Sequence, residues 1–279
     1  MPYDPRDSKT WPSEAAWREA PVYRNATYFY IDITTDEGIT ELKNFIASEN
    51  LAIIGVDANE YAMLSTDDLW TSDTYTVTSV NHANTIVGYD NEFGPYIEAG
   101  EEKFGAFKVA NSWGVGSWEN DLDGFYWMSP QCLKTYIMKA HCYENIPDYH
   151  PEMIAVFEID HSRRGDCQID VGIGSIATKR FDDHIVTGDG NLPFPDNRMV
   201  MDVTELIPSQ QQGSIKGMLS VYDKVSKFTG TIGHFSMETY DDYLSGIPTG
   251  VYISSDTPLE TLNGEAVCAY VKFPGGIFW

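Results

Sequence analysis

Two polar side chains stand at the ends of apolar, strand-like segments, where polar residues are uncommon. His82 opens the segment His-Ala-Asn-Thr-Ile-Val-Gly-Tyr, and Asn111 closes the segment Phe-Lys-Val-Ala-Asn. Taken singly, such a histidine is most often a hydrogen-bonded core residue, and such an asparagine most often caps a turn. Taken together, an imidazole and a side-chain amide can serve as the base and the orienting group for a cysteine nucleophile.

The chemistry of such a pair is specific about its geometry. The amide oxygen of Asn111 would accept one ring N–H of His82 and leave the other ring nitrogen facing a sulfur atom. Trp113 follows Asn111 by two residues and can cover this hydrogen bond, which keeps water from competing for it. We therefore predict that the His82 ring and the Asn111 amide lie within hydrogen-bond distance, with the Trp113 indole packed over them.

The chain has four cysteines to consider as the nucleophile, Cys132, Cys142, Cys167 and Cys268, and all of them follow His82. They form no Cys-x-x-Cys pair and no Cys/His cluster with zinc spacing, so neither a metal nor another cofactor is expected. A single bridge between Cys132 and Cys142 is one alternative. Four buried thiols are the other, and the sequence favours this second interpretation.

The elements around the pair mix helix and strand patterns over the first 145 or so residues. Apolar residues recur on one face of 36–48, which predicts a helix with Thr35 or Asp36 as its N-cap. The stretch 90–103 has the composition of an exposed loop. Strands are expected at 51–56, 74–80, 84–89, 105–110 and 124–128.

Beyond the prolines at 147 and 151, the mixed helix and strand patterns give way to strand and turn patterns alone, which marks 146–152 as a linker. Short strands and turns then alternate up to residue 273, as is typical of a β-sandwich. One stretch, 172–177, matches the dinucleotide fingerprint G-x-G-x-x-A. That fingerprint requires a helix directly after it, and no helical pattern follows, so we expect no dinucleotide site there.

The length of 279 residues is consistent with two domains. The net charge of −24 limits the classes of molecule that the protein is expected to bind. So acidic a surface repels phosphate backbones, which argues against nucleic-acid binding. The apolar runs are too short for a membrane span, and the amino terminus has no signal-peptide core.

The two segments resemble the histidine and asparagine signatures of the papain-like cysteine peptidases. The likeness covers 81–83 (Asn-His-Ala) with 87–89 (Val-Gly-Tyr), then 111–114 (Asn-Ser-Trp-Gly) and 124–126 (Gly-Phe-Tyr), in the order the family has them. The resemblance implies that residues 1–146 are the β-barrel-like part of a papain-like domain. It further implies His82 as general base and acid, Asn111 as the residue that orients it, and Trp113 as its cover, with Asn81 and Ala83 lining the substrate pocket.

The chain departs from this family at the nucleophile. The family's Gln…Cys-Gly-Ser-Cys-Trp segment lies upstream of the histidine, and nothing like it precedes His82. We therefore expect the chain to be the carboxy-terminal part of a cysteine endopeptidase that acts on protein or peptide substrates. Its missing partner would be the amino-terminal lobe, and the chain alone would be inactive. The alternative is a non-catalytic surface-binding or adhesion module with a decayed peptidase half.

Residues 152–279 resemble, more faintly, the jelly-roll P domain that follows secreted subtilisin-like convertases. The segments 157–169, 219–223 and 229–232 carry this likeness. The fold class predicted for the whole chain is therefore α+β: a β-barrel-like lobe with a helix, followed by an all-β jelly-roll sandwich. An extracellular or cell-surface location is implied by the family resemblance alone.

Overall fold

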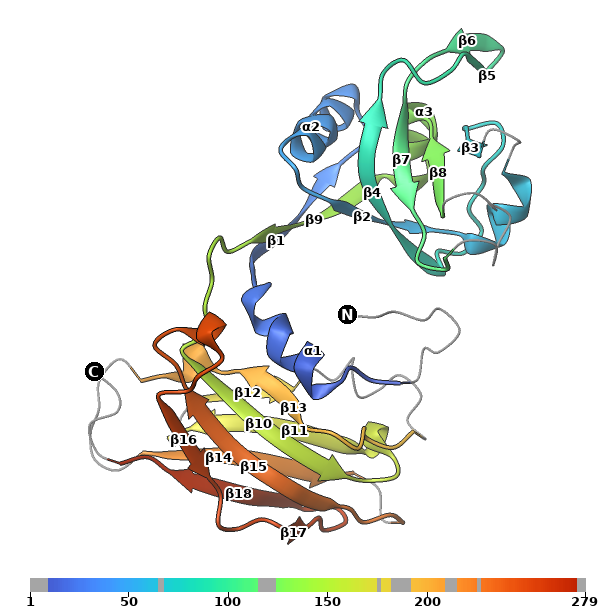
Figure 1. The fold of residues 1–279 in the computed structure, drawn as a ribbon. Helices are drawn as coiled ribbons and strands as arrows, with labels where there is room; N and C mark the ends of the chain where they lie inside the picture. The colour runs from blue at the N-terminus through green and yellow to red at the C-terminus, as the bar shows by residue number, and fades with distance from the viewer. Residues whose placement is uncertain are drawn as a thin grey trace. The chain divides into compact units, whose positions relative to one another are not determined.

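The computed structural model describes residues 10–64, 68–114, 124–174, 177–181, 192–208, 215–224 and 227–274. The chain divides into two compact units. One is Asn25–Ile146, and the other combines Met1–Arg24 with Pro147–Trp279 (Figure 1). Each unit has its own hydrophobic core. Residues up to Arg24, which the sequence analysis counted with the first domain, thus belong with the second.

The unit Asn25–Ile146 is built on a seven-stranded sheet with the order β1-β9-β2-β4-β7-β8-β3. All neighbouring strands are antiparallel except β3 and β8. The bounds are β1 Asn25–Asp32, β2 Ala52–Val56, β3 Leu69–Trp70, β4 His82–Asp90, β7 Ala106–Ala110, β8 Phe125–Met128 and β9 Lys139–Asn145. The expected barrel is absent, because within the described ranges the sheet is open and its end strands β1 and β3 do not pair.

One face of this sheet is covered by α2, Asp36–Ala47. Thr35 is its N-cap, with the side-chain oxygen accepting the Gly38 N–H at 3.1 Å, which satisfies an otherwise free amide of the first turn. Leu42 and Ile46 then point into the core, where they join Ile54 and Ile86 of the sheet. The helix predicted at 36–48 is therefore confirmed.

Other short elements complete this unit. The stretch 90–103, expected to be a loop, holds a small hairpin of β5 (Tyr96–Glu98) and β6 (Glu101–Lys103). A short helix, α3 (Pro130–Cys132), runs into a π-helical turn, Leu133–Ile137. Short 3-10 helices lie at Ala20–Val22, Ala58–Met63, Arg164–Asp166, Thr204–Leu206 and Tyr243–Ser245.

The strand predicted at 74–80 is wrong. This segment is β-branched and aromatic, yet it forms turns and extended loop. Its backbone N–H groups at Thr78 and Ser79 donate to the carboxylate of Asp57 at 3.1 and 3.0 Å. A strand would need those groups for a neighbouring strand, and a buried carboxylate has taken them instead.

The second unit contains a β-sandwich of two antiparallel sheets. One has the order β13-β10-β15-β16, with β17 also paired to β15, and the other has the order β12-β11-β14-β18. Apolar residues of both sheets form one core, including Phe157, Val171, Leu219 and Phe235. The bounds are β10 Met153–Asp160, β11 Cys167–Ile173, β12 Ala177–Phe181, β13 Met199–Asp202, β14 Lys216–Asp223, β15 Thr231–Thr239, β16 Gly250–Ile253, β17 Leu259–Glu260 and β18 Ala266–Lys272.

The strand β12 begins at Ala177, at the end of the G-x-G-x-x-A match. β12 is an antiparallel partner of β11, with Ile173 opposite Ala177, so a strand and not a helix continues the chain. No helix among the described residues is both long and apolar enough to cross a membrane.

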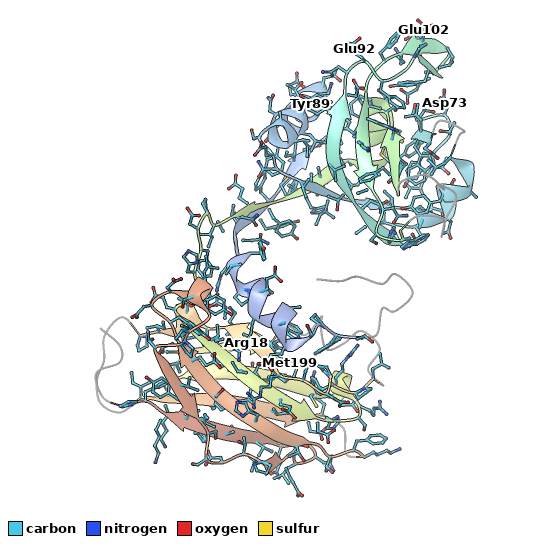
Figure 2. The ribbon with its side chains drawn as sticks, viewed as in Figure 1. Arg18, Asp73, Tyr89, Glu92, Glu102 and Met199 are labelled. Atoms are coloured by element: carbon cyan, nitrogen blue, oxygen red, sulfur yellow. The ribbon has the colours of Figure 1, made fainter. Side chains whose placement is uncertain are left out.

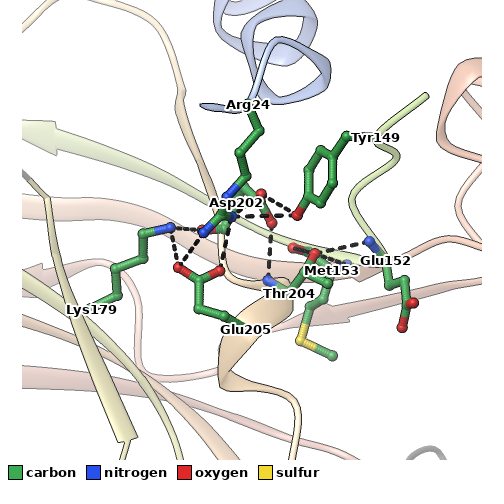
Figure 3. A network of polar contacts seen from close by, with 8 residues as sticks. All are labelled: Arg24, Tyr149, Glu152, Met153, Lys179, Asp202, Thr204 and Glu205. Carbon is green, nitrogen blue, oxygen red and sulfur yellow. Dashed lines mark hydrogen bonds and ion pairs between the residues drawn. The ribbon is translucent and has the colours of Figure 1, made fainter. Parts of the chain in front are cut away.

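The short helix α1, Glu14–Glu19, ties the amino-terminal segment to the sandwich. Arg18, labelled in Figure 2, donates to both carboxylate oxygens of Glu238 at 2.8 and 3.1 Å. Arg24 contacts Asp202 at 2.5 Å and Glu205 at 3.0 Å, in a network with Lys179 and Tyr149 (Figure 3).

Apolar packing also explains why residues 10–24 belong to the second unit and not to the first. Trp17 and Val22 cover a small buried cluster of Ile154, Val156 and Val200. Apolar contact and charge pairing thus act together to hold residues 10–24 on the sandwich.

Candidate active site

His82 and Asn111 lie on neighbouring strands of the first sheet. His82 is the first residue of β4, and Asn111 directly follows β7, the next strand in the sheet. The Nε2 atom of His82 is 2.9 Å from Oδ1 of Asn111. The side chain of His82 is half-buried and that of Asn111 is 9% exposed, so the contact lies at the edge of the core.

Trp113 packs against the histidine ring. The two ring centroids are 4.8 Å apart, with 39° between the planes. Tyr61 meets Trp113 edge-on at 5.3 Å and His82 edge-on at 6.3 Å. The predicted contact between the three residues is present, and a second aromatic ring, which the sequence did not indicate, supports it.

A buried carboxylate fixes the segment that leads to His82. Asp57 has no exposed surface and follows β2 directly. Its two oxygens accept from Thr78, Ser79, Asn59 and Asn81. These hydrogen bonds, above all the one from the Thr78 hydroxyl, hold the pKa of Asp57 well below its usual range. This carboxylate therefore stays charged and clamps the chain immediately before His82.

The two residues suggested as pocket lining occupy different environments. Asn81 is engaged in the clamp: Nδ2 donates to Asp57 at 2.9 Å, and Oδ1 accepts the N–H of Ala58 at 2.9 Å. Ala83 is exposed beside His82. The Asn81 amide thus supports the segment before His82, and the side chain of Ala83 is exposed.

Asn84 is a residue of the site that the sequence analysis missed. It is 2% exposed and lies two residues after His82, so both side chains project to the same face of β4. Its Nδ2 donates to Asn111 Oδ1 at 3.3 Å, and its Oδ1 accepts the hydroxyls of Tyr61 and Tyr126 at 2.5 and 2.9 Å. A polar residue at an inward position between His82 and the buried Ile86 was the available signal.

The cysteines of this unit are buried thiols. All four cysteines of the chain are free, so the bridge between Cys132 and Cys142 does not form. Cys142 lies opposite Ala52 of β2, whereas His82 lies opposite Val56 of the same strand. Four residues of strand separate the two positions by about 13 Å. Cys142 is therefore not the partner of the histidine.

Burial also lowers the reactivity of these sulfur atoms. It raises the pKa of Cys142 to about 11 and that of Cys167 to about 12, and it raises the pKa of Cys132 further still. A nucleophilic cysteine needs the opposite shift, toward the thiolate at neutral pH.

No protein-family model matches the chain, and no curated protein matches it. Among solved structures it is similar to SERA5E from Plasmodium falciparum, with 16% identity, a TM-score of 0.33, and coverage of 46% of this chain and 52% of that one. It is also similar to digestive procathepsin L2 proteinase from the Tenebrio molitor larval midgut, with 25% identity, a TM-score of 0.31, and coverage of 43% and 34%.

A third similar structure contains the cysteine protease and lectin-like domains of Cwp84, a surface layer associated protein of Clostridium difficile. The identity is 12% and the TM-score 0.31, with coverage of 86% of this chain and 62% of that one. Papain-like cysteine protease domains are thus among the structural neighbours. The chain spans about a third to three fifths of the length of these structures. The three TM-scores lie below 0.5, so these similarities assign no function to the site.

Proposed function

We propose that the unit Asn25–Ile146 supplies the histidine and asparagine of a papain-like cysteine endopeptidase. The contact of His82 Nε2 with Asn111 Oδ1 at 2.9 Å, under the Trp113 ring, carries this proposal. An amide oxygen accepts but does not donate, so His82 carries its proton on Nε2. Nδ1 is then the nitrogen with a lone pair, available to a thiol.

The reaction follows from that tautomer. A cysteine from outside these 279 residues transfers its thiol proton to Nδ1 of His82, and the thiolate attacks the carbonyl carbon of a peptide bond. The imidazolium then protonates the departing amine as the acyl–enzyme thioester forms. Water hydrolyses the thioester with Nδ1 accepting its proton, which restores the thiol. Asn111 keeps the ring in register throughout, and Trp113 shields their hydrogen bond.

The remaining parts of the chain are assigned accessory roles in this proposal. Ala83, next to the histidine, lines the pocket for the second residue of the substrate, and Asn81, held by its bond to Asp57, lines the same pocket. The sandwich acts as a P-domain-like jelly-roll module that stabilises the peptidase or positions its substrate. The location is extracellular or at the cell surface, and the missing partner is the lobe that brings the nucleophile and a donor for the oxyanion.

A peptidase assay on two proteins tests the proposal. One is the 279-residue chain, and the other is the full translation product of its gene, including any coding sequence before residue 1. With a fluorogenic peptide, we expect hydrolysis that a thiol-directed epoxide inhibits only from the longer product, and a loss of about 10²- to 10⁴-fold in the His82→Ala variant.

Three results would contradict this function. They are inhibitor-sensitive hydrolysis by the 279-residue chain itself, hydrolysis by the longer product that survives His82→Ala, and a longer product that is folded but hydrolyses no peptide. The last result would favour a non-catalytic binding module.

A further inference from the structure

Asn84 sits at the centre of a buried polar chain that ends on His82. The chain begins with the hydroxyls of Tyr61 and Tyr126, which donate to Asn84 Oδ1. It continues from Asn84 Nδ2 to Asn111 Oδ1, and from there to His82 Nε2. The two tyrosines are 3% and 0% exposed, so water does not compete for these bonds.

A backbone carbonyl fixes the direction of this chain. Besides the contact with Asn111, Asn84 Nδ2 donates to the carbonyl oxygen of Ala83 at 3.1 Å. A backbone carbonyl only accepts, so the NH₂ end of Asn84 must face it. With the amide turned the other way, two oxygen atoms would meet without a proton between them.

The orientation of the Asn84 amide in turn fixes the orientation of the Asn111 amide. Because the NH₂ group of Asn84 points at Asn111, the atom of Asn111 that faces it must be the oxygen. The same oxygen faces His82 Nε2, so this nitrogen must carry the ring proton. The tautomer of His82 is thus determined three hydrogen bonds away, at the carbonyl of Ala83.

The arrangement leaves one donor unsatisfied. Among the described residues, Nδ2 of Asn111 is buried without a hydrogen-bond partner. A flipped Asn111 would give this NH₂ an acceptor in His82, provided that the ring proton moved to Nδ1. The contact with His82 alone therefore does not choose between the two orientations of Asn111, since each makes one hydrogen bond to the ring, and it is Asn84 that opposes the turn.

We propose that Asn84 is a positioning residue that holds His82 in the Nε2–H tautomer through Asn111. This inference rests on the proposed function for its significance, since only that tautomer leaves Nδ1 as a base. Burial raises the pKa of both phenols, which keeps them as donors to Asn84 over the working range of pH.

The test reads the tautomer directly, in the 279-residue chain. The ¹⁵N shifts of the two ring nitrogens separate protonated from unprotonated nitrogen at pH 9, where an ordinary histidine is neutral. The chain has six histidines, and a His82→Gln variant assigns the signal. In the parent chain we expect the Nε2–H form to exceed the Nδ1–H form by at least about tenfold.

Two variants form a matched pair. The triple variant Asn84→Leu, Tyr61→Phe, Tyr126→Phe removes the polar chain and leaves no phenol unpaired, which protects folding. We expect it to lower the tautomer ratio by at least about tenfold. The control carries only Tyr61→Phe and Tyr126→Phe and retains Asn84 with its bond to the Ala83 carbonyl, so its ratio should stay at the parent value.

The inference is overturned if the triple variant keeps the parent ratio, if the control loses it, or if the parent chain already holds the Nδ1–H form. A triple variant that does not fold is replaced by one with Asn84→Val in place of Asn84→Leu and the same two phenylalanine substitutions, read in the same way. None of these readings needs a thiol or turnover. An inactive longer product with the expected tautomers would therefore refute the proposed function and leave the role of Asn84 standing.

Discussion

The cysteines of the chain offer a direct experiment on whether it contains its own nucleophile. Iodoacetamide alkylates the thiolate, so the rate depends on both pKa and access. An exposed cysteine with a pKa near 8.5 is about a quarter thiolate at pH 8. Cys142, with a pKa of about 11, is about one part in a thousand thiolate.

The raised pKa of Cys142 accounts for only part of the slow alkylation that we expect of this thiol. The thiolate fraction of Cys142 is lower by about 240-fold, but a more basic thiolate is also a better nucleophile, by about 13-fold for this difference in pKa. The net effect is about 20-fold. Cys142 has no exposed surface, however, so alkylation also requires local opening, which slows it further. We therefore expect a slowing of more than about 100-fold relative to a free thiol.

Mass spectrometry after timed alkylation measures this for every cysteine. Cys268 is partly exposed and should be labelled first, while Cys132, Cys142 and Cys167 react on the timescale of opening or after denaturation. The Cys268→Ala variant should then show no rapidly labelled site. A fast-reacting cysteine in the unit Asn25–Ile146 would refute the reasoning, because it would put a reactive thiol on the same unit as His82.

Two further predictions concern the elements that position the site, and a third concerns the division into two units. Gly38→Ala should destabilise its unit by about 2 kcal/mol or more in denaturant melts, although alanine favours helices by about 1 kcal/mol, since its Cβ would lie 1.8 Å from a backbone oxygen of β1. Asp57 has a lowered pKa in the folded state, so its stabilisation is full above the unfolded value of about 3.9 and is lost as the pH falls below it; melting temperatures from pH 6 to pH 2 should fall less steeply for Asp57→Asn. Joining Arg24 to Pro147 by a short Gly/Ser linker in place of 25–146 should give a folded, strand-rich circular-dichroism spectrum, whereas an unfolded product would contradict the division into units.

The linker prediction follows from the register of the strands at the base of the first unit. Asn25, at the start of β1, lies opposite Asn145, at the end of β9. Paired residues in an antiparallel sheet have Cα atoms about 5 Å apart, so the two cut ends are close together. The remaining chain keeps residues 10–24 on the sandwich through Trp17 and the Arg18–Glu238 pair.

The parts of the fold that the sequence predicted depend on local patterns. The helix at Asp36–Ala47 has an apolar stripe and an N-cap within a few residues of each other, and β4 and β7 are short runs of strand-forming residues. The contact of His82 with Asn111 was also predicted, from the two motifs and the chemistry of an imidazole beside an amide. The two side chains meet because each residue stands at the end of its strand and the two strands are neighbours. Their catalytic roles remain a proposal.

The failures have a common physical origin, which is competition from residues distant in sequence. The segment 74–80 has strand propensity, but Asp57, some twenty residues earlier, captures its amides. Residues 10–24 precede the first unit in the sequence, yet Arg18 and Arg24 pair with carboxylates that lie much later in the chain, those of Glu238 and Asp202. Propensity describes a segment on its own and cannot weigh a buried partner that lies elsewhere.

Asn84 shows why a site can be half-visible in a sequence. Its inward position beside His82 follows from strand alternation, and this much the sequence contained. Its proposed role depends on which way its amide points, and the bond to the Ala83 carbonyl fixes that direction. Strand alternation alone places the Asn84 side chain on the inner face of β4. Only the three-dimensional contacts determine which end of its amide faces Asn111. In the proposed site, this direction decides which nitrogen of His82 remains to act as a base.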